Sequence, residues 1–446
     1  MKIPSVEEEI TVSGWYAVLG RVPLAQLLTQ EINCDHLVIG GGWMGLHCAR
    51  RLAELEPDAS VVLVDAGRIG NNAAGRCAGF AIDLAHNPRN AHFAEDMKGN
   101  TQEYHINLEG IAYIKKAVEE FGVKCDWSEE GKYHSAATTN GVAHLKKFAH
   151  ALDNFKQDYS WVEKDEIQEI TGSKHYIKAL FAPGTVLLQP AKYMRQAMQA
   201  LPPNVTVYEN TAVTEVTYSG SYTSSHNERH MCRTPMGAIR PKKVFLCNAG
   251  YLTKFGFHDK TAIPLYTYAS MTRPLTQDES TTLNARRTFG VIPADSFGTT
   301  LRRTADNRLF LRNVYSYARG FKSTQKDLDK AKKMHQLAFD RRYPDLSNIG
   351  YETSWGGMMT LSHNGGMVFG KLAQNVFGTA FCNGTGVSRG TTFGKALAEY
   401  ALGMESRSID ILLSRTTPNK GMPQLITEVG VRATTSLRMF QAGREV

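Results

Sequence analysis

The chain reads His36-Leu-Val-Ile-Gly-Gly-Gly-Trp-Met-Gly-Leu-His-Cys-Ala-Arg-Arg-Leu-Ala-Glu-Leu-Glu-Pro-Asp-Ala-Ser-Val-Val-Leu-Val-Asp-Ala-Gly67. A short apolar run at 37–39 leads into three glycines, and the residues that follow carry apolar side chains at helical spacing. A second apolar run at 61–64 ends at Asp65. This order predicts a strand, a tight turn, a helix and a second strand.

The turn carries the spacing G-x-G-x-x-G at Gly40, Gly42 and Gly45. The first glycine permits a sharp turn, the second lets the backbone approach a pyrophosphate, and the third lets the helix pack close to the strand. The helix N-terminus offers free N–H groups and partial positive charge to the phosphates. Asp65 is placed to accept hydrogen bonds from ribose hydroxyls. The pattern predicts a dinucleotide site, and the alternative is an ordinary glycine turn with Asp65 as a solvated strand end.

The loop after Asp65 distinguishes FAD from NAD. It is rich in small residues and contains Asn71-Asn-Ala-Ala-Gly-Arg-Cys-Ala-Gly-Phe80. This loop resembles the corresponding segment of the D-amino-acid oxidase superfamily, also called the glycine/sarcosine oxidase superfamily, of FAD-dependent amine oxidoreductases. Ala74 stands where that family has serine, and Cys77 where it has asparagine. Over nearly the whole chain, the sequence is most similar to the γ-glutamylputrescine oxidase-like subgroup.

The resemblance implies further contacts with FAD. Val213 corresponds to the family's adenine-binding segment, with an ordinary buried strand residue as the alternative. The strand that ends at Ala249-Gly250 resembles one that packs near the flavin. The turn Asn383-Gly-Thr-Gly386 resembles the family's glycine turn, and the predicted helix Thr391–Leu402 would aim its positive end at the flavin. The expected FAD-binding residues are Gly40, Gly42, Trp43, Met44, Gly45, Asp65, Ala66, Arg68, Ala74, Gly75, Arg76, Val213, Ala249, Gly250, Gly384, Thr385, Gly386 and Val387.

The resemblance also implies the reaction. An amine C–N bond would be oxidised by hydride transfer to flavin N5, the imine would be hydrolysed, and O2 or another acceptor would take the electrons. FAD is expected to be non-covalent, because the segment 352–360, which aligns with the linkage site of sarcosine oxidases, contains no cysteine. The candidate catalytic residues are Tyr266, Trp355, His363 and Arg389. A structural role is the alternative for His363, and a non-catalytic flavoprotein subunit is the alternative for the chain.

The expected class of substrate depends on one positively charged side chain that this chain lacks. In sarcosine oxidases a lysine just after the glycine turn anchors the substrate carboxylate, and Ser388 stands there in this chain. Arg389 is adjacent, but one helical step turns it about 100° away. The sequence therefore favours a γ-glutamylated or alkyl amine over a glycine or D-amino-acid oxidase or dehydrogenase. Arg302 or Arg312 would restore the anchor if it reached the pocket, although most charges of the 302–308 hairpin are expected to be solvated.

The expected fold class is α/β with α+β insertions: a Rossmann-like FAD-binding domain and a second, mixed-sheet substrate domain. A chain of 446 residues is long enough for two domains. The FAD-binding domain is expected from three separated segments, 33–90, 176–260 and 350–405. The insertions between them, 91–175 and 261–349, would build the substrate domain. An N-terminal arm, 1–32, and a C-terminal helical extension, 406–446, complete the chain.

Composition argues against a nucleic-acid-binding, a membrane-spanning or a metal-binding protein. The net charge is +8 and the pI about 9.0, but the cations are scattered, so nucleic-acid binding is not expected. No apolar run reaches the length of a membrane span. The seven cysteines are dispersed without a C-x-x-C pair, which favours reduced thiols in a cytoplasmic protein and no metal site. The sequence leaves the oligomeric state open, a homo-oligomer included.

Overall fold

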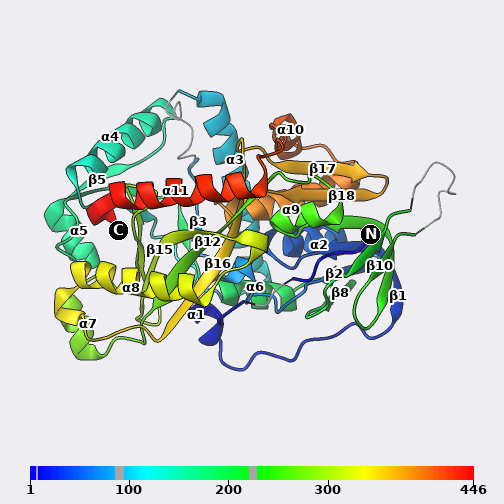
Figure 1. Ribbon diagram of the computed structural model, residues 1–446, viewed down its shortest axis with the longest axis horizontal. Helices are drawn as coiled ribbons and strands as arrows, with labels where there is room; N and C mark the ends of the chain where they lie inside the picture. Colours follow the sequence, from blue (N-terminus) through cyan, green and yellow to red (C-terminus); the bar gives the residue numbers. More distant parts are fainter. Residues whose placement is uncertain (7–8, 86–94, 220–228) are drawn as a thin grey trace.

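The computed structural model describes residues 1–6, 9–85, 95–219 and 229–446, and two large sheets lie next to each other along its long axis (Figure 1). Helices cover the sheets and join their strands. The α-helices are α1 Gly14–Ala17, α2 Trp43–Leu55, α3 Met97–Phe121, α4 Thr139–Asn154, α5 Lys164–Thr171, α6 Pro190–Gln199, α7 Gln277–Leu283, α8 Gln325–Arg342, α9 Ser388–Ala401, α10 Arg407–Ser414 and α11 Gln424–Ala442.

The first sheet has the order β17-β18-β11-β1-β2-β8. The run from β18 to β8 is parallel, β17 is antiparallel to β18, and β10 and β9 extend the sheet from β11. Its strands are β1 Glu31–Ile39, β2 Val61–Val64, β8 Val205–Tyr208, β9 Glu215–Thr217, β10 Met231–Arg233, β11 Ala238–Leu246, β17 Val368–Ala373 and β18 Val376–Ala380. A parallel core with helical crossovers is the arrangement that the glycine motif predicts.

The second sheet has the order β16-β12-β15-β14-β13-β4-β6-β5 and is antiparallel except between β13 and β4. Its strands are β4 Lys132–Ala136, β5 Ser160–Glu163, β6 Lys178–Ala182, β12 Ala262–Met271, β13 Phe289–Pro293, β14 Thr300–Arg303, β15 Leu309–Tyr317 and β16 Thr353–Ser362. A short antiparallel pair is formed by β3 Phe80–Ala81 and β7 Val186–Leu187.

These sheets confirm the predicted α/β class. The parallel sheet draws its strands from three separated parts of the chain, while β6 and β16 lie within the segments predicted for the FAD-binding domain but pair in the second sheet. The predicted domain limits themselves stay a prediction, and the limit at residue 90 falls outside the described residues.

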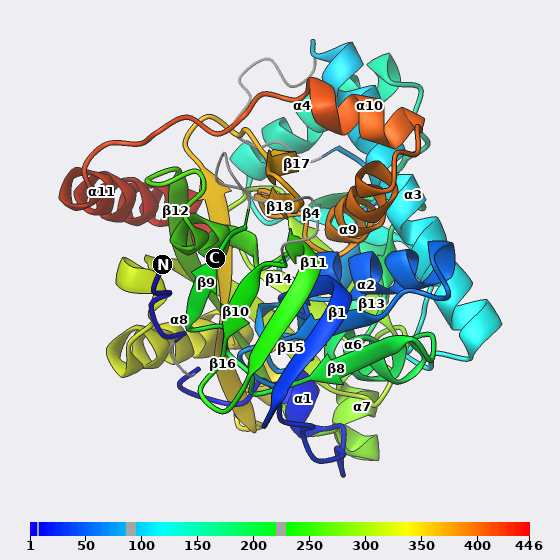
Figure 2. The ribbon, with the colours of Figure 1, turned by 90° about the vertical axis from the view of Figure 1, so that its right-hand side faces the viewer.

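Helices α2, α9 and α3 pack together beside the parallel sheet (Figure 2). Glycines permit this close approach: a Cβ on Gly394 of α9 would lie 1.9 Å from the carbonyl oxygen of Met44, and one on Gly110 of α3 would lie 1.9 Å from that of Ser388. The buried residues of α2 include Leu46, Ala49, Leu52 and Ala53. The helix after the first strand is thereby fixed against both the sheet and a helix from the far end of the chain.

The hairpin predicted at 302–308 is present between β14 and β15, and Asp306 is exposed, but the three arginines are not solvated. Arg302, Arg303 and Arg308 are all buried. Arg302 donates to the carbonyl oxygens of Ala78, Gly79 and Leu188. The prediction was wrong because backbone carbonyls from distant loops, invisible in the sequence, bind these guanidinium groups.

Among the helices of the described residues, none combines the length and the apolar character that crossing a membrane requires. All seven cysteines are free thiols.

Candidate active site

The glycine turn after β1, with Gly40, Gly42 and Gly45, forms a narrow hollow at the start of α2, which is called the cradle below. Gly40 has φ of +104°, and a Cβ there would lie 2.9 Å from the carbonyl oxygen of Cys247 at the end of β11. A Cβ on Gly45 would lie 1.7 Å from the carbonyl oxygen of Gly40. Gly42 is the N-cap of α2 and brings no side chain to its first turn. The first N–H groups of α2 therefore keep their capacity to bind an anion.

Asp65 lies at the end of β2, directly beside this turn. Its carboxylate accepts hydrogen bonds from the N–H of Gly41 at 2.7 Å, the N–H of Gly67 at 2.9 Å and the side-chain amide of Asn72 at 3.0 Å. Burial raises the pKa of Asp65, while these donors act to lower it. The carboxylate thus holds the glycine turn and the following loop together, a contact that sequence reasoning did not foresee.

The loop after Asp65 closes over the start of α2. The indole N–H of Trp43 donates to the carbonyl oxygen of Ala74 at 3.0 Å, and its ring stacks on Tyr193 with centroids 5.0 Å apart. Arg76 donates to the carbonyl oxygens of Asn71 at 2.8 Å and Gly356 at 2.9 Å. Its guanidinium therefore joins the loop to β16 of the second sheet.

A second helix N-terminus lies beside the first. Gly384 has φ of +100°, and Gly386 has open space around it. Helix α9 follows from its N-cap Val387, which brings no side-chain cap, and it begins earlier than the predicted Thr391. A Cβ on Gly390 of α9 would lie 3.1 Å from that of Trp43, so the positive ends of α2 and α9 are neighbours.

The remaining predicted FAD contacts fall around this cradle. Thr211 donates its N–H to the carbonyl oxygen of Asp65 at 2.8 Å, which holds the segment leading to Val213 beside the end of β2. Val213 itself is buried among apolar residues. Ala249 and Gly250 follow β11, and a Cβ on Gly250 would lie 2.3 Å from Thr360 of β16. Ala66 precedes Gly67, whereas Arg68 turns toward the arm, where it donates to the carbonyl oxygen of Pro23.

Buried polar atoms at the cradle fit a bound dinucleotide. Asn72 Oδ1, Asn248 Oδ1 and Thr385 Oγ1 are buried and have no hydrogen-bond partner among the described residues. Buried polar atoms in folded proteins are nearly always paired, so three around one cradle indicate a ligand with several donors and acceptors. Together with the glycines and the two helix N-termini, they match the needs of FAD.

The family comparison agrees with this geometry. The model of the family "FAD dependent oxidoreductase" matches residues 35–400. The chain belongs to this family. It is thus an enzyme of the FAD-dependent oxidoreductase class and uses FAD, as the cradle and the Asp65 loop predicted.

Individual relatives of this oxidoreductase are distant but match along most of its length. It is 24% identical to gamma-glutamylputrescine oxidoreductase of Escherichia coli, over 90% of this chain and 91% of that protein. It is 23% identical to "Probable oxidoreductase OrdL" of Haemophilus influenzae, over 91% of this chain and 92% of that protein. Among solved structures, glycine oxidase from Geobacillus kaustophilus matches with a TM-score of 0.68 at 15% identity, over 88% of this chain and all of that one. That likeness shows the fold.

Two of the candidate catalytic residues of the oxidoreductase lie beside Arg76. Trp355 is fully buried and donates its indole N–H to the carbonyl oxygen of Arg76 at 3.1 Å. The ring of Tyr266 stacks on that of Tyr268 in the same strand, β12, with centroids 6.3 Å apart. The hydroxyl of Tyr268 instead bonds Ser316 and Ser323. The roles of Trp355 and Tyr266 in a substrate pocket stay predictions.

The other two candidates lie elsewhere. Arg389 on α9 donates to the carbonyl oxygen of Cys382 at 3.1 Å and to the carboxylate of Glu103 at 3.0 Å. His363 lies in the turn after β16, against Gly421 from the C-terminal extension. These contacts give both residues a structural use, and their catalytic roles stay predictions.

The N-terminal arm reaches the same region, which the sequence did not indicate. The Glu9 carboxylate lies 3.8 Å from the guanidinium of Arg76 and accepts a hydrogen bond from Tyr266 at 3.3 Å. Burial raises the pKa of Glu9, and Arg76 acts to lower it. Glu9 and Tyr266 are 257 positions apart, so no local pattern connects them.

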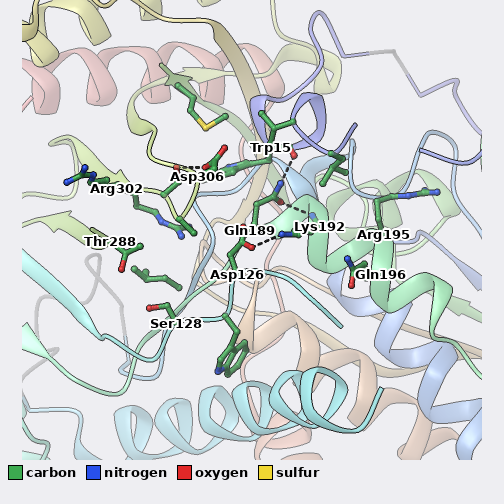
Figure 3. Close-up of a pocket in the computed structure, with 18 of the residues that line it drawn as sticks. Trp15, Asp126, Ser128, Gln189, Lys192, Arg195, Gln196, Thr288, Arg302 and Asp306 are labelled. Atoms are coloured by element: carbon green, nitrogen blue, oxygen red, sulfur yellow. Dashed lines mark hydrogen bonds and ion pairs between the residues drawn. The ribbon is translucent and has the colours of Figure 1, made fainter. Parts of the chain in front are cut away.

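A cavity of about 880 Å³ lies apart from the cradle, between the arm, α6 and the edge of β14 (Figure 3). Gln189, the N-cap of α6, and Lys192 within this helix line the cavity. Gln189 donates to the carbonyl oxygen of Trp15 at 2.6 Å, and Lys192 pairs with Asp126 at 2.6 Å. The residues that line it include neither the cradle glycines nor Tyr266 or Trp355. The residues that the sequence proposed for catalysis and for FAD therefore do not line this cavity.

Proposed function

We propose that this oxidoreductase oxidises the C–N bond of an amine that has no carboxylate next to the reacting carbon, with γ-glutamylated or alkyl amines preferred. The observation that carries the proposal is the engagement of the nearby cations. Arg389 pairs with Glu103, and Arg302 is bound to three carbonyl oxygens. Arg312 contacts Tyr315 on its own strand. These contacts hold each of the three guanidinium groups on a partner within the protein, which supports a substrate without an α-carboxylate.

Ser388 supports the same proposal. It occupies the position where the resemblance to sarcosine oxidases places a carboxylate-binding lysine, and its hydroxyl is buried and donates to the carbonyl oxygen of Ile82 at 2.6 Å. A hydroxyl fixed in this way carries neither charge nor a free donor toward a substrate. The relative in Escherichia coli whose name includes gamma-glutamylputrescine adds support from overall similarity.

Bound FAD would supply the two-electron acceptor for the reaction, and O2 or another acceptor would reoxidise it. The chain's own residues would bind and orient the reactants. The two helix N-termini at Gly42 and Val387 present N–H groups to negative charge without any proton transfer. The rings of Tyr266 and Tyr268 offer aromatic faces to an alkyl chain or ammonium group. Trp355, which is buried, keeps water from the loop at Arg76.

A second candidate function is oxidation of glycine or a D-amino acid. It is favoured by the Glu9 carboxylate, which lies between Arg76 and Tyr266. A cation and a phenol that accommodate one carboxylate would accommodate that of an amino acid if Glu9 moved away. The two candidate functions predict different effects of removing the Glu9 carboxylate on the preference between amine and amino-acid substrates.

Steady-state kinetics separates them. We expect a higher kcat/KM for γ-glutamylputrescine than for sarcosine or D-alanine at one pH, and the same ranking in Glu9→Gln. Glu31→Gln, at an exposed residue of β1, is the control for a changed carboxylate. If either amino acid is preferred by tenfold, about 1.4 kcal/mol of transition-state energy, the proposal fails. A tenfold gain for D-alanine in Glu9→Gln alone would favour the second candidate.

A further inference from the structure

The cavity between the arm, α6 and the edge of β14 has the size of a ligand site (Figure 3). Its volume of about 880 Å³ accommodates a small organic molecule. Four separate parts of the chain line it: the arm, the segment 126–130, α6 and the 302–306 hairpin. The chemistry of the lining side chains therefore decides what kind of molecule fits.

Arg302 brings to this cavity a guanidinium group with one unused edge. It is 5% exposed and lies between the rings of Trp15 and Phe80, 5.3 and 5.5 Å from their centroids. Its three hydrogen bonds to carbonyl oxygens all come from Nη1. Nε is buried without a partner among the described residues, and Nη2 makes no hydrogen bond to them either. The N–H groups of Nε and Nη2 form the fork that binds a carboxylate with two parallel hydrogen bonds.

A second unpaired group, the hydroxyl of Ser128, lines the same cavity. The backbone of Ser128 pairs with Leu187 of β7 in both directions at 2.9 Å, and the next carbonyl along, that of Leu188, accepts from Arg302. The two unpaired groups are thus anchored on consecutive residues of one segment. Buried polar atoms are nearly always paired in folded proteins, and an arginine can only donate. A molecule that completes this site must therefore offer acceptor oxygens.

The balance of charge around the cavity is positive. Four carboxylates line it, and three of them are paired with a cation. The pairs are Asp126 with Lys192, Glu129 with Lys115 and Asp306 with Arg308, at 2.6, 2.8 and 2.8 Å. The fourth, Glu130, accepts from the hydroxyl of Thr288 at 2.6 Å. Arg21 and Arg287, both exposed, and the buried Arg302 form no ion pair within the described part of the chain. Burial lowers the pKa of Arg302 to about 10, so it is charged at neutral pH.

We propose that this cavity binds a small organic carboxylate with an apolar body, held by the Nε and Nη2 edge of Arg302. An amine would add positive charge beside unpaired arginines, and a neutral molecule would leave that charge unbalanced. A phosphate carries nearly two charges and three strong acceptor oxygens, more than this one fork and a hydroxyl would satisfy. The apolar body would lie against the remaining lining, which includes Trp15, Val18, Leu19, Val22 and Met271. The proposal goes beyond the amine oxidation proposed above and does not rest on it.

Isothermal titration calorimetry of the full-length FAD-loaded protein tests this site, with 3-phenylpropionate as the probe. We expect saturable binding, with a Kd at least tenfold lower than those of 3-phenylpropanamide and phenyl phosphate. Arg302→Lys keeps the charge but loses the fork and should raise the Kd at least tenfold. Ser128→Ala and Arg287→Gln should each raise it about threefold. Arg438→Gln, at an exposed residue of α11 that does not line the cavity, is the matched control and should leave it unchanged.

Several results would overturn the proposal. These are no binding of 3-phenylpropionate, equal or tighter binding of the amide or the phosphate, and an unchanged Kd in both Ser128→Ala and Arg287→Gln. Binding that shifts the flavin absorption spectrum and is displaced by γ-glutamylputrescine would place the probe at the cradle and would also overturn it. Melting temperature and flavin content show whether each variant is folded. If Arg302→Lys is not, the other two variants decide. Amine kinetics that contradicted the proposed function would leave this result unaffected.

Discussion

Asp65 shows how one side chain serves both the fold and the cofactor site. Its carboxylate accepts from Gly41, Gly67 and Asn72, and it lies where the resemblance to the family places the FAD ribose. We expect Asp65→Ala to weaken FAD binding more than it slows turnover of the FAD-loaded enzyme. Hydrogen bonds to a charged acceptor are worth about 1.5–3 kcal/mol, so Kd should rise by roughly one to two decades.

Titration of the apoprotein with FAD, followed by quenching of flavin fluorescence, measures this change in Kd. Asp58→Ala is the matched control, because Asp58 is an exposed residue between α2 and β2. Equal affinity in Asp65→Ala and the wild type would show that Asp65 does not support the ribose or its cradle.

Cysteine chemistry predicts how FAD is held. Cys382 and Cys77 are the thiols next to the glycine turn and the Asp65 loop, and burial raises their pKa to about 12 and about 11. Both are therefore protonated near neutral pH and poor nucleophiles. Together with the absence of cysteine from 352–360, this predicts non-covalent FAD. After acid precipitation the yellow colour should leave with the supernatant, and colour retained in the pellet would contradict the prediction.

At the scale of elements, the contact between α2 and α9 determines how close the N-termini of these two helices lie at the cradle. Gly394 is where the two helices touch, and an added Cβ would lie 1.9 Å from the Met44 carbonyl. We expect Gly394→Ala to push the helices apart, to destabilise the protein by about 1–3 kcal/mol and to weaken FAD binding. Gly430→Ala places the same methyl group on α11 in open space and should stabilise that helix by about 0.5–1 kcal/mol. Thermal unfolding with and without FAD measures both, and equal melting temperatures would refute the packing argument.

At the scale of the whole molecule, the last residues fasten the C-terminal extension to the second sheet. The buried carboxylate of Glu445 accepts from the N–H groups of Ala137 and Thr138 and from the Thr138 hydroxyl at 2.7 Å. We expect Glu445→Ala to leave these donors unpaired and to cost about 1–3 kcal/mol, seen as a lower melting temperature. Glu405→Ala, at an exposed site after α9, should have no such effect. A melting temperature of Glu445→Ala equal to that of the wild type would mean that water replaces the carboxylate.

The sequence alone determined the FAD-binding unit, because its signals are local. Gly40, Gly45 and Asp65 lie within 26 residues of one another, and each acts through the backbone next to it. The family, the α/β class and the cofactor followed from such short-range patterns.

Only the tertiary structure decided which charged groups are free. Arg302 and Arg389 look alike in the sequence, yet each is buried against partners from other elements, and Glu9 meets Arg76 only because the arm folds back across the second sheet. The outward face of α11 was also hidden, since the sequence predicts a helical extension at 406–446 but not which side of it meets the protein. Long-range packing settles these points because the free energy of a buried charge depends on the donors and acceptors around it, and those come from distant parts of the chain.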